Sequence, residues 1–134
     1  MQGWTRIDAV LTPEVVAEAG EDRRGYFEGL AALQAGDLAG ATRRFKDASK
    51  ACEAPFDALS MVALGECERA SGRHGVALKT WRKVAQDEAQ PVVARLTAWT
   101  SIAAVEAERA NTRGAEEAER HRQTLENLLG ETSR

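Results

Sequence analysis

The sequence has 134 residues, of which 43% are hydrophobic, 29% charged and 5% aromatic, with a formal net charge of −3. This length and composition fit a single soluble globular domain. The acidic balance lacks the positive field that phosphate binding requires, so nucleic acid is not an expected partner. The sequence has neither an apolar run of membrane-span length nor the start of a signal peptide. We therefore expect a cytoplasmic protein without membrane insertion.

The residues that could carry metal or catalytic chemistry are few. Cys52 and Cys67 are the only cysteines, and His74 and His121 the only histidines. A zinc site needs about four such ligands at suitable spacing, so we predict that both thiols are reduced and packed as small hydrophobes. The sequence shows no nucleophile beside a base and no carboxylate pair at an apolar position. We predict a protein that is not an enzyme and binds no cofactor or metal.

The N-terminal residues 1–22 are predicted to form an extension. Trp4, Ile7, Val10 and Leu11 recur at three- and four-residue spacing, which indicates a short amphipathic helix. Such a short helix is marginal alone and must dock on another surface. The stretch from Thr12 to Glu14 has the features of a helix start.

The first predicted hairpin extends from residue 23 to residue 54. Apolar residues at helical spacing predict a helix from about residue 23 to residue 34. Gly36 and Asp37 then favour a turn, because glycine accepts a left-handed backbone and aspartate readily starts turns. A second helix is predicted from Leu38 to about Ala51. Since only three residues join the two helices, they must lie antiparallel.

The second predicted hairpin, residues 55–90, repeats the first with a period of 36 residues. Its first helix follows Pro55, a turn is expected at residues 71–74, and the return helix extends from Val76 to about Asp87. The repeated residues are Gly29, Gly36, Ala41 and Phe45, which recur as Gly65, Gly72, Ala77 and Trp81. A fixed period of this size indicates a repeat array. We expect the small residues to face one another where the helices approach closely, and the aromatic rings to fill the wider end.

A third, degenerate hairpin is predicted over residues 91–129. It has a long helix from Pro91 to about Ala110, a turn at residues 111–114 and a polar last helix that caps the array. Ala118, Arg122 and Leu125 occupy the places of Ala77, Trp81 and Val84, so the aromatic is lost. On the charged face of this helix we expect pairs such as Glu116–Arg120.

These residues resemble the tetratricopeptide repeat family, whose hairpins combine small residues, a glycine turn and an aromatic. The matching residues are Gly29, Gly36, Asp37, Ala41, Phe45 and Ala48 in the first repeat, and Leu64, Gly65, Gly72, Ala77 and Trp81 in the second. Val84 and His74 depart from the family pattern. The resemblance implies an all-α fold, a right-handed superhelix of antiparallel helix hairpins, here with an extra N-terminal helix. We divide the single domain, residues 1–134, into an extension (1–22), repeats (23–54, 55–90 and 91–129) and a tail (130–134).

The resemblance also implies a partner-binding groove lined by the first helix of each hairpin. In this sequence the groove residues would be Arg23, Tyr26, Leu30, Gln34, Leu59, Val62, Glu66, Arg69, Arg95, Ala98 and Ile102. This lining mixes apolar and charged side chains. We therefore expect a non-catalytic adaptor that binds a peptide segment or helix of another protein.

Two alternatives have similar architecture. One is a small secretion-type chaperone, which joins an N-terminal helix to three such repeats. The other is a self-associating structural module, a homodimer whose interface is formed by the N-terminal segment around Trp4 and Leu11.

Overall fold

A computed structural model of the protein describes residues 21–132 and contains, within that range, six α-helices and no strand. The helices are α2 (Glu21–Gln34), α3 (Leu38–Ala51), α4 (Phe56–Ala70), α5 (His74–Ala85), α6 (Val92–Glu108) and α7 (Thr112–Thr132). This confirms the all-α prediction, and the predicted helix ends lie within a few residues of the observed ones. The predicted helix near Trp4 and the predicted helix start at Thr12 lie outside the described residues.

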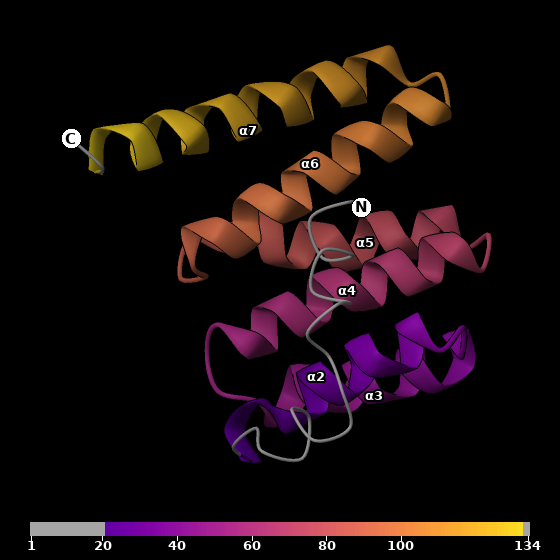
Figure 1. Cartoon of the computed structure of the whole chain (residues 1–134). Helices are drawn as coiled ribbons and strands as arrows, with labels where there is room; N and C mark the ends of the chain where they lie inside the picture. The colour runs from indigo at the N-terminus through magenta and orange to yellow at the C-terminus, as the bar shows by residue number, and fades with distance from the viewer. Residues whose placement is uncertain (1–20, 133–134) are drawn as a thin grey trace.

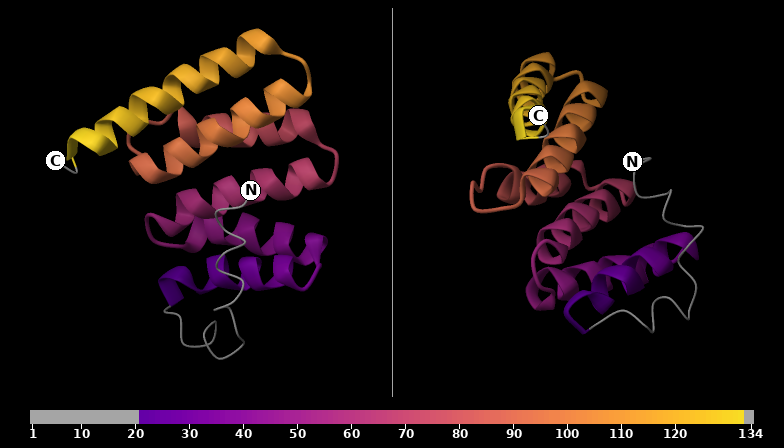
Figure 2. Two further views of the ribbon diagram at one scale, coloured as in Figure 1. Left: turned by 45° about the horizontal axis from the view of Figure 1, so that its top comes forward. Right: turned by 60° about the vertical axis from the view of Figure 1, so that its left-hand side comes forward.

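The helices pack in chain order, each against the next (Figure 1). In addition, α2 contacts α4, and α4 contacts α6. The second helices of the hairpins contact one another less: in the described part of the chain, α3 with α5 and α5 with α7 share fewer contacts than α2 with α4 or α4 with α6. The first helices of the three hairpins therefore form one layer and the second helices the other. The views in Figure 2 show the hairpins following one another from α2 to α7.

In each hairpin, one residue with a left-handed backbone conformation ends the first helix. Gly36 and Gly72 have φ angles of 79° and 83°, which glycine adopts without steric penalty. In the third hairpin the same position is taken by Ala110, with a φ of 59°. Gly114 was placed in the turn by the sequence but lies inside α7, which begins at Thr112.

Side-chain caps start the second helices of the first and third hairpins. The carboxylate of Asp37 accepts a hydrogen bond from the amide of Gly40 at 2.9 Å. The side-chain oxygen of Asn111 accepts one from the amide of Gly114 at 3.2 Å. Each cap satisfies a backbone donor that the first helical turn leaves unpaired.

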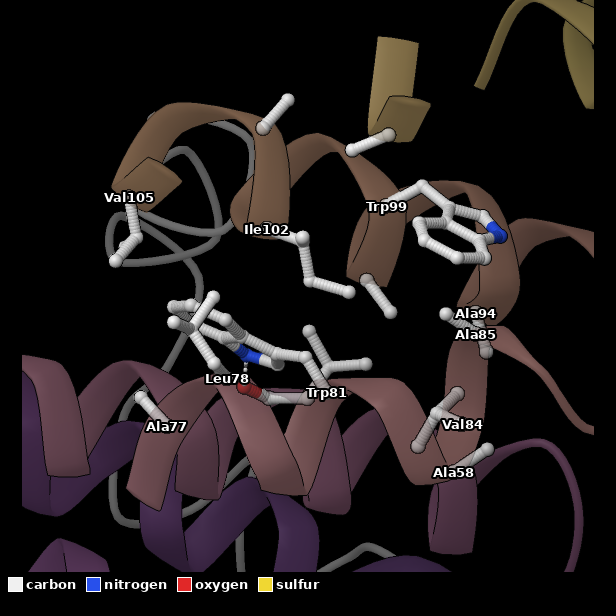
Figure 3. Packing of buried hydrophobic residues seen from close by; sticks show 14 of the residues in the cluster. Ala58, Ala77, Leu78, Trp81, Val84, Ala85, Ala94, Trp99, Ile102 and Val105 are labelled. Carbon is white, nitrogen blue, oxygen red and sulfur yellow. Dashed lines mark hydrogen bonds between the residues drawn. The ribbon is translucent and has the colours of Figure 1, made fainter. Parts of the chain in front are cut away.

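The buried side chains form two clusters, one on each side of α4. The larger cluster joins α4, α5, α6 and α7 around Trp81, Trp99 and Ile102 (Figure 3). The smaller cluster joins α2, α3 and α4 around Phe45 and includes Cys67, which is 1% exposed. Cys67 and the half-buried Cys52 are free thiols, as predicted.

In the first two hairpins a glycine on the first helix makes room for an aromatic ring on the second. A Cβ atom on Gly29 would lie 2.4 Å from a ring carbon of Phe45, and one on Gly65 would lie 2.2 Å from Trp81 Nε1. The sequence-based interpretation placed these glycines against the alanines of the facing helix. The structure corrects this interpretation, because each glycine faces the ring itself. We call each glycine–ring contact an aromatic lock.

Candidate protein-binding surface

Five of the eleven predicted groove residues are buried in the described structure. The exposed fraction is 8% for Tyr26, 2% for Leu30, 3% for Val62, 0% for Ala98 and 2% for Ile102. The cause is that α2, α4 and α6 are each packed against more than one helix, and the number of neighbouring helices cannot be read from the sequence of one helix. These side chains belong to the core and leave little surface for a partner.

Tyr26 is buried because its ring packs against aromatic rings of two neighbouring helices. Its ring lies 6.1 Å from the ring of Phe45 and 5.7 Å from that of Phe56, centroid to centroid. Burial raises the pKa of the Tyr26 hydroxyl to about 12. The contacts join α2, α3 and α4, so Tyr26 holds the first hairpin to the second.

Two of the charged groove residues cross the seam between α4 and α6. The hydroxyl of Ser101 donates a hydrogen bond to Glu66 at 2.8 Å. Arg69 pairs with Glu108 on α6 and lies 3.8 Å from Glu66 on its own helix. The side chain of Arg69 is still 31% exposed. We call these four residues the α4–α6 seam.

The remaining groove residues also contact neighbouring helices. Arg95 donates a hydrogen bond from Nε to the carbonyl of Ala85 at 3.0 Å, which links α6 to the end of α5. Leu59 is partly buried and packs against both core clusters. Gln34, at the end of α2, is partly buried. Arg23 is exposed, with its guanidinium 5.4 Å from the centroid of the Phe56 ring, the geometry of a cation–π contact.

The sequence did not predict the groove between α6 and α7. It has a volume of about 810 Å³ and is open to solvent. Its lining combines small side chains with charged ones. The lining residues are Thr100, Ala103, Ala104, Ala107, Thr112, Ala115, Glu116, Glu119 and Arg120. We call this the α6–α7 groove.

The groove occupies the place where an aromatic lock is missing. In the first two hairpins the lock glycine is seven residues before the left-handed turn residue, and the aromatic is nine residues after it. Counted from Ala110 in the same way, the two positions are Ala103 and Glu119, and both line the groove. Counted in this way the aromatic position is Glu119, whereas the sequence-based interpretation placed Arg122 there. The lost aromatic was visible in the sequence, but its consequence, an open groove, was not.

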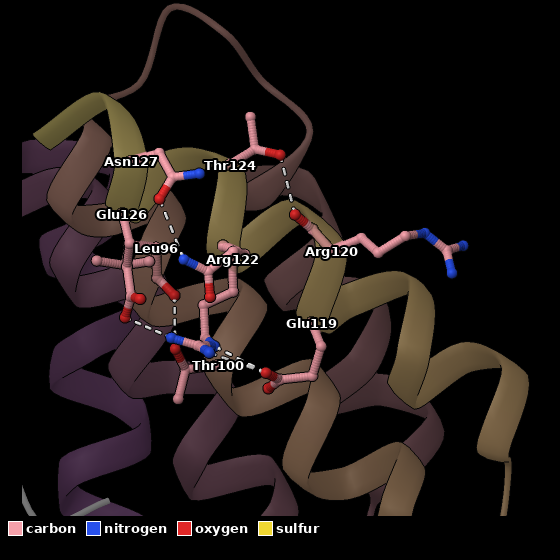
Figure 4. A network of polar contacts seen from close by, with 9 residues as sticks. Leu96, Thr100, Glu119, Arg120, Arg122, Thr124, Glu126 and Asn127 are labelled. Carbon is pink, nitrogen blue, oxygen red and sulfur yellow. Dashed lines mark hydrogen bonds and ion pairs between the residues drawn. The ribbon is translucent and has the colours of Figure 1, made fainter. Parts of the chain in front are cut away.

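The polar contacts of α7 centre on Arg122, which lies beside Leu96 and Thr100 of α6 (Figure 4). Its guanidinium donates to Glu119 at 2.9 Å and also pairs with Glu126. In the described part of α7 these pairs stand in place of the predicted pair of Glu116 with Arg120. Ala118 and Leu125, predicted to face inward, are 1% and 4% exposed. The last helix is therefore held by a narrow apolar stripe and charged at its surface.

Among the described residues, no group of three or more His, Cys, Asp or Glu side chains could hold a metal ion. None of the helices within residues 21–132 combines the length and the hydropathy of a membrane span.

Comparisons of the chain with models of known protein families, with curated proteins and with solved structures find no match. The resemblance to the tetratricopeptide repeat therefore remains a prediction from the residues themselves.

Proposed function

We propose that this chain is a non-catalytic protein-interaction module of the tetratricopeptide type that binds a segment of another protein across the layer formed by α2, α4 and α6. The observation that supports this proposal is the side-by-side contact of these three helices, which the second helices do not share to the same extent. A row of first helices forms a broad surface against which an extended or helical segment can lie.

Only some of the eleven predicted groove residues are accessible to a partner. They are the members that keep some exposure, which are Arg23, Gln34, Leu59, Glu66, Arg69 and Arg95. Near the C-terminal ends of α4 and α6 the surface presents the partly exposed pair of Arg69 and Glu108, and at the start of α4 it presents the partly buried apolar side chain of Leu59. This combination suits a partner segment that alternates apolar and charged side chains.

A pair of matched arginine variants tests the proposal. Arg69 and Arg82 each pair with a glutamate of α6, but Arg69 belongs to the first-helix layer and Arg82 to the second. Proteins captured from the source cell by the wild-type chain are identified, and their affinity for purified Arg69→Ala and Arg82→Ala is measured. We expect Arg69→Ala to weaken binding about tenfold or more, while Arg82→Ala leaves it unchanged.

The melting midpoints of the two variants provide the control for folding, because each loses one ion pair between helices. A partner that binds Arg69→Ala as tightly as wild type, but not Arg82→Ala, would place the functional surface on the second helices. Leu30→Glu is unsuitable as a test because Leu30 is 2% exposed. That substitution would bury a charge in the core.

A further inference from the structure

The α6–α7 groove lies where the next helix of the array would stack. In the second hairpin, Ala77, Leu78 and Trp81 belong to the same core cluster as Ala98, Ile102 and Val105 of α6. Counted from the turn residues Gly72 and Ala110, the counterparts of Ala77, Leu78 and Trp81 are Ala115, Glu116 and Glu119. All three counterparts line the groove, and no helix in the described part of the chain covers them. The third hairpin therefore presents an unused stacking face.

The other end of the array presents the reverse face. Helix α4 packs on the first hairpin through Leu59, Ala63 and Cys67, which lie in the cluster around Phe45. The residues 36 positions earlier, on α2, are Arg23, Phe27 and Ala31. Arg23 is exposed, and Phe27 and Ala31 are partly exposed. These three residues of α2 are therefore the repeat equivalents of the residues through which α4 packs on the first hairpin.

The two faces are complementary in size. Where α4 meets the first hairpin, the hairpin supplies the large ring of Phe45 and α4 supplies the small side chain of Ala63. In the groove the aromatic position holds Glu119, and four of the nine lining residues are alanines. On α2 the counterpart of Ala63 is Phe27. The helix that would stack there therefore carries a bulky ring, which is partly exposed and also contacts the rings of Tyr26 and Phe56 in its own copy.

The two faces are also complementary in charge. Leu59 of α4 packs in the cluster that contains Phe45. The counterpart of Leu59 on α2 is Arg23, and the counterpart of Phe45 in the groove is Glu119. The two ends of the array therefore carry opposite charges at positions that are apolar inside the array. Arg23 and Glu119 are both exposed in the described structure, although Arg23 also lies over the ring of Phe56 and Glu119 also pairs with Arg122. A charge pair at the edge of an interface fixes register and excludes wrong partners.

We propose that copies of this chain associate head to tail, with α2 of one copy stacked in the α6–α7 groove of the next, Phe27 entering above Ala103 and Arg23 opposing Glu119. This inference goes beyond the proposed function, because it concerns the two ends of the array and not the first-helix layer. A head-to-tail contact joins two different surfaces and does not close at two copies. Association would thus prolong the layer of first helices from one copy into the next.

Sedimentation of the full chain between about 1 μM and 1 mM, the range in which weak contacts dissociate, tests the proposal. We expect the average mass of the wild type to rise with concentration and to pass that of a dimer. Arg23→Glu and Glu119→Arg should each weaken association about tenfold or more, because each places like charges opposite one another. The double variant Arg23→Glu/Glu119→Arg should restore it, because the pair is then reversed and not lost.

Two charge reversals outside the proposed contact serve as controls. Glu117→Arg lies on the same helix as Glu119 but does not line the groove, and Arg43→Glu lies on the exposed side of α3. Both should leave the mass distribution unchanged. A wild type that remains monomeric at every concentration overturns the proposal. So does a double variant that fails to recover association, or a control that dissociates the assembly as strongly as the groove variants.

Discussion

The indole of Trp81 occupies the space that a side chain on Gly65 would need. A Cβ atom on Gly65 would come within 2.2 Å of Trp81 Nε1, and that nitrogen donates a hydrogen bond to the carbonyl of Val62 at 3.0 Å. Trp81 is 0% exposed, so the ring has no open direction into which it could move. The lock therefore fixes both the distance between α4 and α5 and the orientation of the ring.

The first prediction follows from this contact. Gly65→Ala should lower the free energy of unfolding by about 1–3 kcal/mol, because the added methyl group forces the ring out of its position. Urea unfolding measures the change. The control is Gly75→Ala in α5, where a Cβ atom would meet nothing within 4 Å. That substitution should be neutral or stabilise by up to about 1 kcal/mol. Equal effects at the two sites would contradict the lock.

The second prediction concerns the caps of α3 and α7. Asp37→Ala should cost about 1 kcal/mol, the usual value for losing a helix N-cap. Asn111→Ala should cost about 1–3 kcal/mol more. The amide of Asn111 also donates to the carboxylate of Glu106 at 2.6 Å, and that side chain is 5% exposed. Removing the donor leaves a buried charge with one hydrogen bond fewer.

Asn111→Ser separates the two contributions in urea unfolding. Serine restores the cap but not the amide donor, so this variant should recover about 1 kcal/mol of the loss. If Asn111→Ala costs no more than Asp37→Ala, the bond to Glu106 contributes nothing measurable.

The helices were predictable from the sequence because their ends are marked locally. Gly36, Gly72 and Asp37 determine turn and cap by their own chemistry, whatever packs around them. The binding residues were less predictable, because burial depends on how many neighbours a helix has. Tyr26 and Leu30 lie on a face that could be a groove or a core, and only the position of α4 decides this. The partner of Arg69 lies 39 residues away on another helix, and no local pattern indicates that distance.

The third prediction concerns alkaline pH. Burial raises the pKa of the Cys67 thiol from 9.0 to about 11. The folded state therefore holds this proton more tightly than the unfolded state. The resulting stability is complete below pH 9 and is lost as the pH rises from about 9 to about 11. Tyr26 adds a similar loss between pH 10 and about 12. The free energy of unfolding should fall by up to about 1.4 kcal/mol per pH unit for each of the two groups, first through Cys67 above pH 9 and then through both groups between pH 10 and pH 11.

Two alanine variants assign this dependence on pH. Cys67→Ala should flatten the fall between pH 9 and pH 10, although the lost volume lowers stability at every pH. Val62→Ala, which also removes buried volume but no titratable group, should keep the wild-type slope. Urea unfolding at several pH values measures both. Identical slopes for wild type and Cys67→Ala would show that this thiol does not titrate with unfolding.

The last prediction installs an aromatic lock in the third hairpin. Glu119→Trp alone should gain little, because Ala103 carries a Cβ atom where Gly29 and Gly65 have none. Ala103→Gly alone should cost about 1 kcal/mol, the usual penalty for glycine inside a helix. The two together should be more stable than the sum of their separate effects by about 0.5–3 kcal/mol, since only then can the ring lie against the backbone of α6.

A double-mutant cycle in urea unfolding measures this coupling, and Glu117→Trp combined with Ala103→Gly is its control. Glu117 is exposed and does not line the groove, so that combination should be additive. If the effects at Ala103 and Glu119 are additive as well, the third hairpin cannot accept an aromatic lock. Ala103 and Glu119 would then not correspond in space to the glycine and the aromatic of the first two hairpins. A positive coupling would also fill the α6–α7 groove from within. The double variant should then remain monomeric at concentrations where the wild type associates.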